Sequence, residues 1–133
     1  MKNLFYVFLI AILTACFSNK PGVEKKSNIE KPVVIANDSL EYKIIIMDPG
    51  FNTYLLSIAK PMNYYSQGYY KIKNDLYVNE WNRNVMSPRP GFQNIFEQRI
   101  DYDESIDYGL EVNYKLFNYF KFVEYKYRYR FNF

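Results

Sequence analysis

The chain begins with an unbroken apolar run, residues 4–13, that ends three residues before its only cysteine, Cys16. Lys2 gives this segment a positive start, and about ten apolar residues suit a signal-peptide core but are too few to span a bilayer as a helix. Removing the fifteen residues before Cys16 from the 133-residue chain leaves 118 residues. A chain of that length supports one modest core, which has to fold without disulfides because no second cysteine is present.

The end of the apolar segment indicates lipid attachment. Residues 13–16 (Leu-Thr-Ala-Cys) resemble a lipobox, in which a bacterial lipoprotein signal is cleaved before a diacylated cysteine. Acyl chains on Cys16 would hold the protein at a membrane, because each buried methylene contributes about 0.8 kcal/mol. Phe17 stands where an inner-membrane retention signal carries Asp, and no acidic run of the surface-export type follows. We therefore expect an outer-membrane lipoprotein that faces the periplasm.

Missing residue types narrow the possible chemistry. The chain has no His, and its single Cys is assigned to the anchor. Serine–histidine catalysis, cysteine–histidine catalysis and thiolate metal sites are thereby excluded. The formal net charge of +3 is too small to indicate a nucleic-acid partner. We expect no cofactor and no nucleic acid, and we expect the 15 Tyr and 11 Phe to serve mainly packing and surface.

Composition divides the chain into three parts. Residues 1–15 are the predicted signal peptide, residues 16–37 the lipidated cysteine with a polar tether, and residues 38–133 a single globular domain. Within the domain, residues 40–47 are β-branched and aromatic and precede a Pro-Gly turn, which predicts a strand. Residues 125–132 alternate aromatic with basic or amide side chains, which predicts a second strand paired antiparallel with the first.

Helical spacing accounts for most of the remaining domain. Two longer helices are predicted, at residues 66–85 with Ser66 as the N-cap and at residues 108–124, and a short helix is predicted at residues 51–59. Ile72 and Leu76 fall on the predicted core-facing side of the first long helix. The polar residues of the second long helix recur every three or four positions, which predicts one solvated face: Glu111, Lys115, Asn118, Lys121 and Glu124. The expected fold is a small α+β domain.

Eight short motifs occur together in one order along the chain: DSLEY (38–42), III (44–46), DPGF (48–51), AKP (59–61), YYSQ (64–67), YVNEWN (77–82), IDYD (100–103) and YGLEVNY (108–114). Over about residues 38–119 they resemble an uncharacterised family of small lipoproteins from the Bacteroidetes. The resemblance implies a single domain in the cell envelope and supplies no catalytic residue. Asp38–Ser39–Leu40 also weakly resembles an O-glycosylation signal of that phylum, and the favoured alternative is a turn at the start of a strand.

One cluster of acidic residues is a candidate for metal binding and, together with Glu80, for hydrolysis. Asp101, Asp103 and Asp107 have the oxygen spacing that opens a calcium loop, but no Gly occupies the tight turn and Val112 replaces the bidentate Glu. These residues are weak metal candidates, and a solvated loop with Asp107 capping the next helix is the alternative. With Glu80, the same acids would supply the two carboxylates that a glycoside hydrolase needs.

The function that best suits the sequence is a non-catalytic accessory or interaction protein, held at the membrane through Cys16 and bound to an envelope protein. The first alternative is a module that binds peptidoglycan or another glycan by stacking exposed aromatic rings on sugars. Its candidate residues are Trp81, Tyr64, Tyr65, Tyr69 and Tyr70. The second alternative is the carboxylate-based hydrolase.

Overall fold

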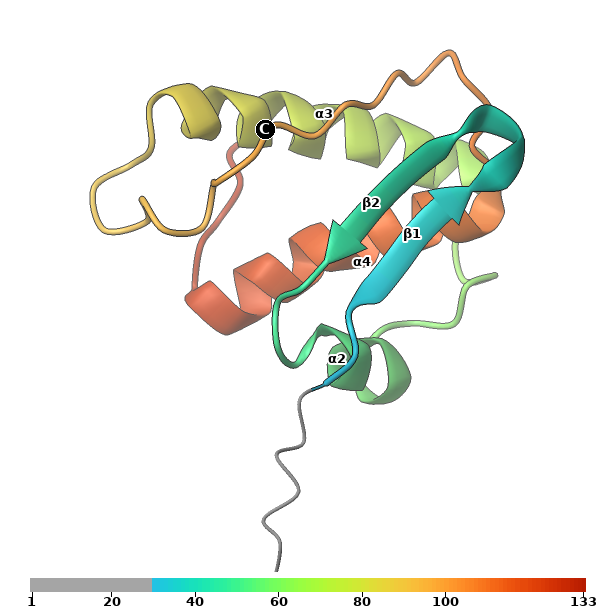
Figure 1. The fold of residues 1–133 in the computed structure, drawn as a ribbon, viewed down its shortest axis with the longest axis horizontal. Helices are drawn as coiled ribbons and strands as arrows, with labels where there is room; N and C mark the ends of the chain where they lie inside the picture. The colour runs from blue at the N-terminus through green and yellow to red at the C-terminus, as the bar shows by residue number, and fades with distance from the viewer. Residues whose placement is uncertain (1–29) are drawn as a thin grey trace, which may run out of the picture.

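A computed structural model describes residues 30–133, which form a β-hairpin laid against helices (Figure 1). β1 (Val33–Asn37) and β2 (Tyr42–Ile46) pair antiparallel in a two-stranded sheet. The 3-10 helix η1 (Asp38–Leu40) connects them, with Ser39 exposed in the turn. The helices and the hairpin share one core, so the prediction of a small α+β domain is confirmed.

The predicted partner of the first strand is wrong. The strand expected at residues 40–47 is present as β2, but it pairs with β1, which lies within the segment expected to be a tether. Val33, Val34 and Ile35 are β-branched and lie a few residues before β2. A short hairpin loop closes at a lower entropy cost than a pairing with the far end of the chain. The folded domain therefore begins before residue 38.

The predicted strand at residues 125–132 is also wrong. α4 (Leu110–Tyr127) includes the first three of these residues, and Arg128 caps its C-terminal end with a φ of 57°, in the left-handed region. The following residues pair with no strand among residues 30–133, yet Tyr129 is buried and Phe131 packs against the core. The alternation therefore marks an extended segment with one core-facing side and does not mark a sheet strand.

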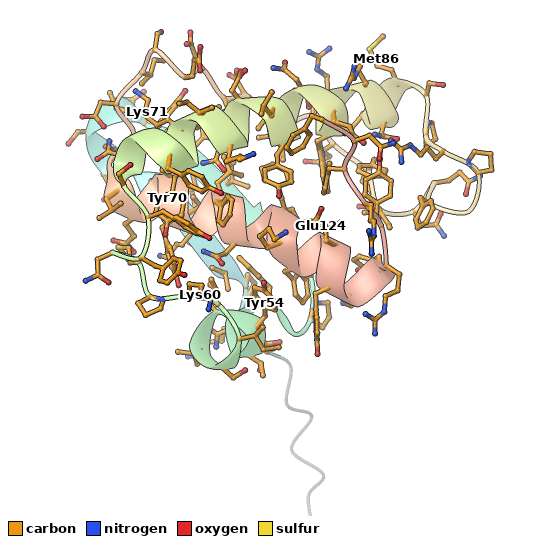
Figure 2. The ribbon with its side chains drawn as sticks, turned by 180° about the vertical axis from the view of Figure 1, so that it is seen from behind. Tyr54, Lys60, Tyr70, Lys71, Met86 and Glu124 are labelled. Atoms are coloured by element: carbon orange, nitrogen blue, oxygen red, sulfur yellow. The ribbon has the colours of Figure 1, made fainter. Side chains whose placement is uncertain are left out.

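The two long helices follow the predicted positions. α3 (Gln67–Met86) packs against α4, and the Ser66 hydroxyl caps α3 by accepting the N–H of Tyr69 at 3.2 Å. Figure 2 shows Tyr70 directed between the helices and Met86 directed away from them. None of the helices among residues 30–133 is long and apolar enough to cross a membrane.

The buried face of α3 is more polar than predicted. Ile72, expected in the core, is 61% exposed, and Leu76 is also exposed, whereas Asn74 is fully buried. The Asn74 side-chain N–H donates to the Asn113 carbonyl oxygen of α4 at 2.9 Å, which joins the two helices, whereas Asn74 Oδ1 is buried without a hydrogen-bond partner among residues 30–133. Asn118, expected on the solvated face of α4, is buried for a related reason, since its amide donates to the carbonyl oxygen one turn earlier.

The short helix α2 (Phe51–Ser57) takes its N-terminal cap from a distant residue. Gly50 precedes the helix and has no side chain to offer, so the carboxylate of Glu30 accepts the N–H groups of Gly50 and Thr53, the latter at 2.8 Å. These backbone bonds hold the pKa of Glu30 below its ordinary value, and the positive charge of Lys126 acts in the same direction. Glu30 thereby joins the chain before β1 to the start of α2.

We expect Glu30→Ala to lower the melting temperature at neutral pH. Because the folded state depresses the pKa of Glu30, its stabilisation is present above the unfolded value of about 4.3 and is lost as pH falls through the folded value. The gap between the wild-type and variant melting temperatures should therefore narrow below about pH 4. Glu104→Ala, at an exposed loop position, is the control. A gap that stays constant with pH would contradict the cap.

Candidate functional site

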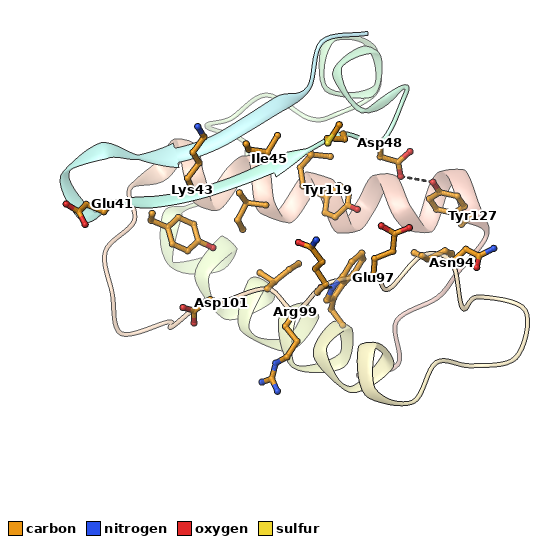
Figure 3. Close-up of a pocket in the computed structure, with 18 residues that line it drawn as sticks. Glu41, Lys43, Ile45, Asp48, Asn94, Glu97, Arg99, Asp101, Tyr119 and Tyr127 are labelled. Carbon is orange, nitrogen blue, oxygen red and sulfur yellow. Dashed lines mark hydrogen bonds between the residues drawn. The ribbon is translucent and has the colours of Figure 1, made fainter. Parts of the chain in front are cut away.

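A cleft of about 850 Å³ runs along β2 and separates this strand from the loop between α3 and α4 (Figure 3). One wall consists of residues 41–48, and the facing wall consists of residues 94–101 without Phe96. Trp81 of α3 and two tyrosines of α4 complete the lining: Tyr119 and Tyr127. The cleft therefore combines a strand, a loop and aromatic side chains of both long helices.

The cleft follows the backbone edge of β2. Side chains of a strand alternate between its two faces, yet every residue from 41 to 48 lines the cleft. β1 occupies the opposite edge of β2, and the sheet formed by residues 30–133 contains only these two strands. Within that range, no backbone hydrogen bond joins residues 42–46 to any segment other than β1. The edge that faces the cleft is therefore open.

The hydrogen-bond phase of the hairpin identifies the backbone groups at this open edge. The Nζ of Lys115 donates to the carbonyl oxygen of Val34 at 3.3 Å, which places this carbonyl on the outer edge of β1. In an antiparallel ladder, two opposed residues direct their N–H and C=O groups either toward each other or both outward, in alternation. Ile45, opposite Val34, and Lys43, opposite Ala36, therefore direct their N–H and C=O groups into the cleft.

Side chains of α3 hold the facing wall in place. Trp81 is 4% exposed, and its indole N–H donates to the carbonyl oxygen of Gln98 at 2.8 Å. The Asn82 amide accepts the N–H of Ile100 at 2.9 Å and donates to the C=O of Ile100 at 2.8 Å. Both backbone groups of Ile100 are thus paired to a side chain, as a neighbouring strand would pair them. The loop keeps its position without contacting the open edge of β2 through backbone hydrogen bonds.

Acidic side chains dominate the rim of the cleft. Glu97 and Asp101 are exposed on the loop, and Glu41 is exposed at the start of the strand wall. Figure 3 shows Glu97 directed toward the cleft, whereas Arg99 and Lys43 point away from it. The cleft is therefore locally negative although the chain as a whole has a formal net charge of +3.

An ion pair and a phenol close the end of the cleft after β2. Asp48 pairs with Lys126 and accepts the hydroxyl of Tyr127 at 2.7 Å (Figure 3). Burial and then the hydrogen bond to Asp48 raise the pKa of the Tyr127 hydroxyl above its ordinary value. Burial, followed by the charge of Asp48, also raises the pKa of Tyr119. Both phenols therefore stay protonated as hydrogen-bond donors, and the charge of Asp48 is compensated.

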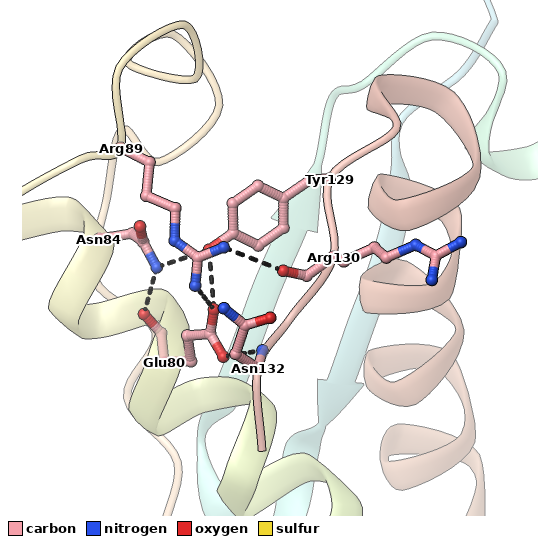
Figure 4. A network of polar contacts seen from close by, with 6 residues as sticks. All are labelled: Glu80, Asn84, Arg89, Tyr129, Arg130 and Asn132. Carbon is pink, nitrogen blue, oxygen red and sulfur yellow. Dashed lines mark hydrogen bonds and ion pairs between the residues drawn. The ribbon is translucent and has the colours of Figure 1, made fainter.

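Glu80, the predicted acid of a hydrolase, is a buried anion within a network that fastens the C-terminal segment to α3 (Figure 4). It is 2% exposed, and one carboxylate oxygen pairs with Arg89 at 2.8 Å and accepts the Tyr129 hydroxyl at 2.8 Å. The other oxygen accepts the N–H of Asn132. Burial and the adjacent carboxylate raise the pKa of Tyr129 to about 12, so this phenol remains a donor. None of these bonds involves Asp101, Asp103 or Asp107, the other predicted acids of the hydrolase.

Two of the three aspartates of the incomplete calcium loop accept hydrogen bonds in local turns, and one of these two, Asp107, also accepts the side-chain N–H of Gln67. Asp103 accepts the N–H and the hydroxyl of Ser105 at 2.8 and 2.7 Å, and these bonds lower the pKa of Asp103. Asp107 accepts the N–H of Gly109 at 3.0 Å, just before α4, while Asp101 is exposed at the rim of the cleft. Among residues 30–133, no three His, Cys, Asp or Glu side chains are grouped closely enough to hold a metal ion.

The five aromatic residues predicted to stack on sugars do not share an exposed face. Trp81 and Tyr70 are buried, which corrects the expectation that they are exposed. Tyr65 and Tyr69 stack on each other with ring centroids 4.2 Å apart, and Tyr64 stands at 89° to Tyr65. The exposed rings of Tyr64 and Tyr69 therefore do not form a coplanar row. The cleft, which the sequence analysis did not identify, is the better-defined site.

The buried role of Glu80 predicts a loss of stability on truncation. We expect Glu80→Ala to lower the free energy of unfolding by about 2–4 kcal/mol, because the Tyr129 hydroxyl and the Asn132 N–H lose their acceptor. Arg89 contributes less, since its side chain is 39% exposed and can be hydrated. Glu111→Ala, which removes an exposed ion pair to Lys115, should cost less than about 1 kcal/mol. Urea denaturation measures the free energy of unfolding of both variants. Equal losses in Glu80→Ala and Glu111→Ala would contradict the structural role assigned to Glu80.

Comparison with known proteins identifies a family. No curated protein and no solved structure matches this chain. A family model described as a family of unknown function, DUF6146, matches residues 4–133. The matched range includes the apolar segment before Cys16 and extends beyond the expected resemblance to include the aromatic C-terminal segment. Since the match covers nearly the whole chain, this protein belongs to DUF6146, a family of unknown function.

Proposed function

We propose that this protein is a lipid-anchored interaction protein of the bacterial envelope, which binds a partner protein in the cleft along β2. The open strand edge carries this proposal, because unpaired N–H and C=O groups in a row are a template for pairing with another chain. The hydrolase is the weaker reading, because Glu80, its predicted acid, is buried outside the cleft and bonded to the C-terminal segment.

The proposed anchor depends on residues that lie outside the described part of the chain. The apolar run 4–13 and the lipobox at 13–16 support cleavage before Cys16 and lipidation of that cysteine. The resemblance to small lipoproteins of the Bacteroidetes supports the same assignment. Phe17 in the position after the cysteine supports an outer-membrane location facing the periplasm. A tether between Cys16 and β1 would keep the cleft close to that membrane.

The anchor is tested by replacing its cysteine. We expect Cys16→Ser to remain uncleaved and unlipidated in a bacterial host that processes lipoproteins, because the acyl group has no thiol to join. Intact-mass spectrometry and membrane fractionation measure the outcome, with Ser18→Ala as the control that should mature normally. Normal maturation of Cys16→Ser would refute the lipoprotein assignment.

The cleft is tested by crosslinking in cells. We expect a photoreactive phenylalanine analogue at Glu97, on the rim of the cleft, to capture one dominant envelope protein. The same analogue at Leu56, which is 80% exposed on α2, should not capture that protein. Mass spectrometry of the adducts identifies the partner. Equal capture from both positions, or capture of no protein from Glu97, would contradict binding at the cleft.

A further inference from the structure

We propose that the cleft binds an extended segment of the partner, which adds to β2 as a third strand and carries Lys or Arg toward the acidic rim. This inference rests on the proposed function and specifies the chemistry of the partner. It depends on three independent properties of the cleft: the backbone groups at its edge, its size and its charge.

The backbone groups are the first property. Lys43 and Ile45 each direct one N–H and one C=O into the cleft, which gives an incoming strand two donors and two acceptors in register. Pairing of this kind is the basis of peptide recognition by strand addition, in which backbone bonds give affinity and alternate side chains give specificity. The facing wall does not compete for these groups, because Ile100 is already paired to Asn82.

The size of the cleft is the second property. β2 has five residues, and a strand of that length is about 17 Å long. With a strand spacing of about 4.8 Å and a layer thickness of about 10 Å, one added strand occupies about 800 Å³. The cleft measures about 850 Å³, so it accommodates one strand and not a second folded domain.

The charge and lining predict the side chains of the segment. Glu97 and Asp101 are exposed on the facing wall, where Arg99 is also exposed but points away from the cleft, and Asp48 is paired with Lys126. Positive side chains on one face of the added strand would meet the carboxylates of Glu97 and Asp101, which have no ion-pair partner among residues 30–133. The opposite face would meet the side chains of Trp81 and Tyr119 and should be apolar. The predicted segment therefore alternates apolar residues with Lys or Arg.

A second copy of this chain is a poorer occupant. Pairing of β2 with β2 of another copy would bring residues 94–101 of that copy into the same space, which holds about one strand. The strand wall also exposes both charge signs, at Lys43 of β2 and at Glu41 just before it, so it does not complement an acidic rim. We therefore assign the cleft to a different protein.

The test uses the full lipidated chain in detergent and a displayed library of random nine-residue peptides. We expect the enriched peptides to alternate apolar residues with Lys or Arg. Binding of an enriched peptide should slow amide hydrogen exchange at Lys43 and Ile45. Ile45→Pro, which removes an N–H at the open edge, should weaken binding at least about tenfold, and Glu97→Lys should also weaken it. Val34→Pro removes the corresponding N–H from the outer edge of β1 and is the matched control.

Several results would overturn the inference. Enrichment of acidic peptides, or of no peptide, would refute the prediction that the bound segment carries Lys or Arg. Equal affinities of Ile45→Pro and Val34→Pro, or unchanged exchange at Lys43 and Ile45, would remove strand addition. Dimerisation through β2, measured by sedimentation, would make a second copy the occupant. If Ile45→Pro fails to fold, two other measurements test the inference: the peptide affinity of Glu97→Lys, and the amide hydrogen exchange of Lys43 and Ile45 in the wild-type protein. Capture of a partner from Glu97 without strand addition would leave the proposed function in place and refute only this inference.

Discussion

The open edge of β2 depends on the hydrogen bonds that join the side chains of Trp81 and Asn82 to the backbone of Gln98 and Ile100. These bonds satisfy backbone groups of the loop between α3 and α4 from the side of α3, so those groups do not have to pair with β2. The hairpin docks on α4 through β1, which leaves the second edge of the sheet facing a gap. Proteins usually cover or charge such an edge to avoid unwanted pairing, and here the rim is acidic.

The stability of this arrangement depends on polar groups buried in α3. Asn74 bonds to α4, Glu80 bonds to the C-terminal segment, and the Asn84 amide donates to the hydroxyl of Tyr129 at 2.9 Å. Most buried polar groups are hydrogen-bonded, and through these bonds each of the three residues joins α3 to one partner segment. The C-terminal segment needs this support because it has no strand pairing of its own. Its aromatic side chains then complete the core beside Tyr77.

The sequence predicted those elements whose signals are local. Ser66 marks the start of α3, the Asp48–Pro49–Gly50 turn marks the end of β2, and both are found where expected. β1 was missed because its five residues lie directly after Pro32 in a polar stretch. The C-terminal segment was misassigned because an alternating pattern shows that one side is buried but does not reveal whether a neighbouring strand exists.

The candidate site was less predictable, because its parts lie far apart in the sequence. Its strand wall, residues 41–48, lies far in the sequence from its loop wall, residues 94–101, and from Tyr119 and Tyr127 of α4. Trp81 was assigned to sugar binding because a tryptophan among tyrosines suggests stacking, whereas its indole instead supports a loop. An open strand edge has no sequence motif, since it is defined by what does not pair with it. Only the three-dimensional arrangement identifies it.

The most direct test of the open edge is residue-by-residue amide hydrogen exchange of the protein without a partner. The N–H groups of Tyr42, Ile44 and Ile46 point to β1 and should exchange slowly, whereas those of Lys43 and Ile45 should exchange much faster. This alternation along one strand is the result that the account predicts. Uniform protection of all five amides would show that the edge is already paired, and it would contradict the assignment of the cleft as a binding site.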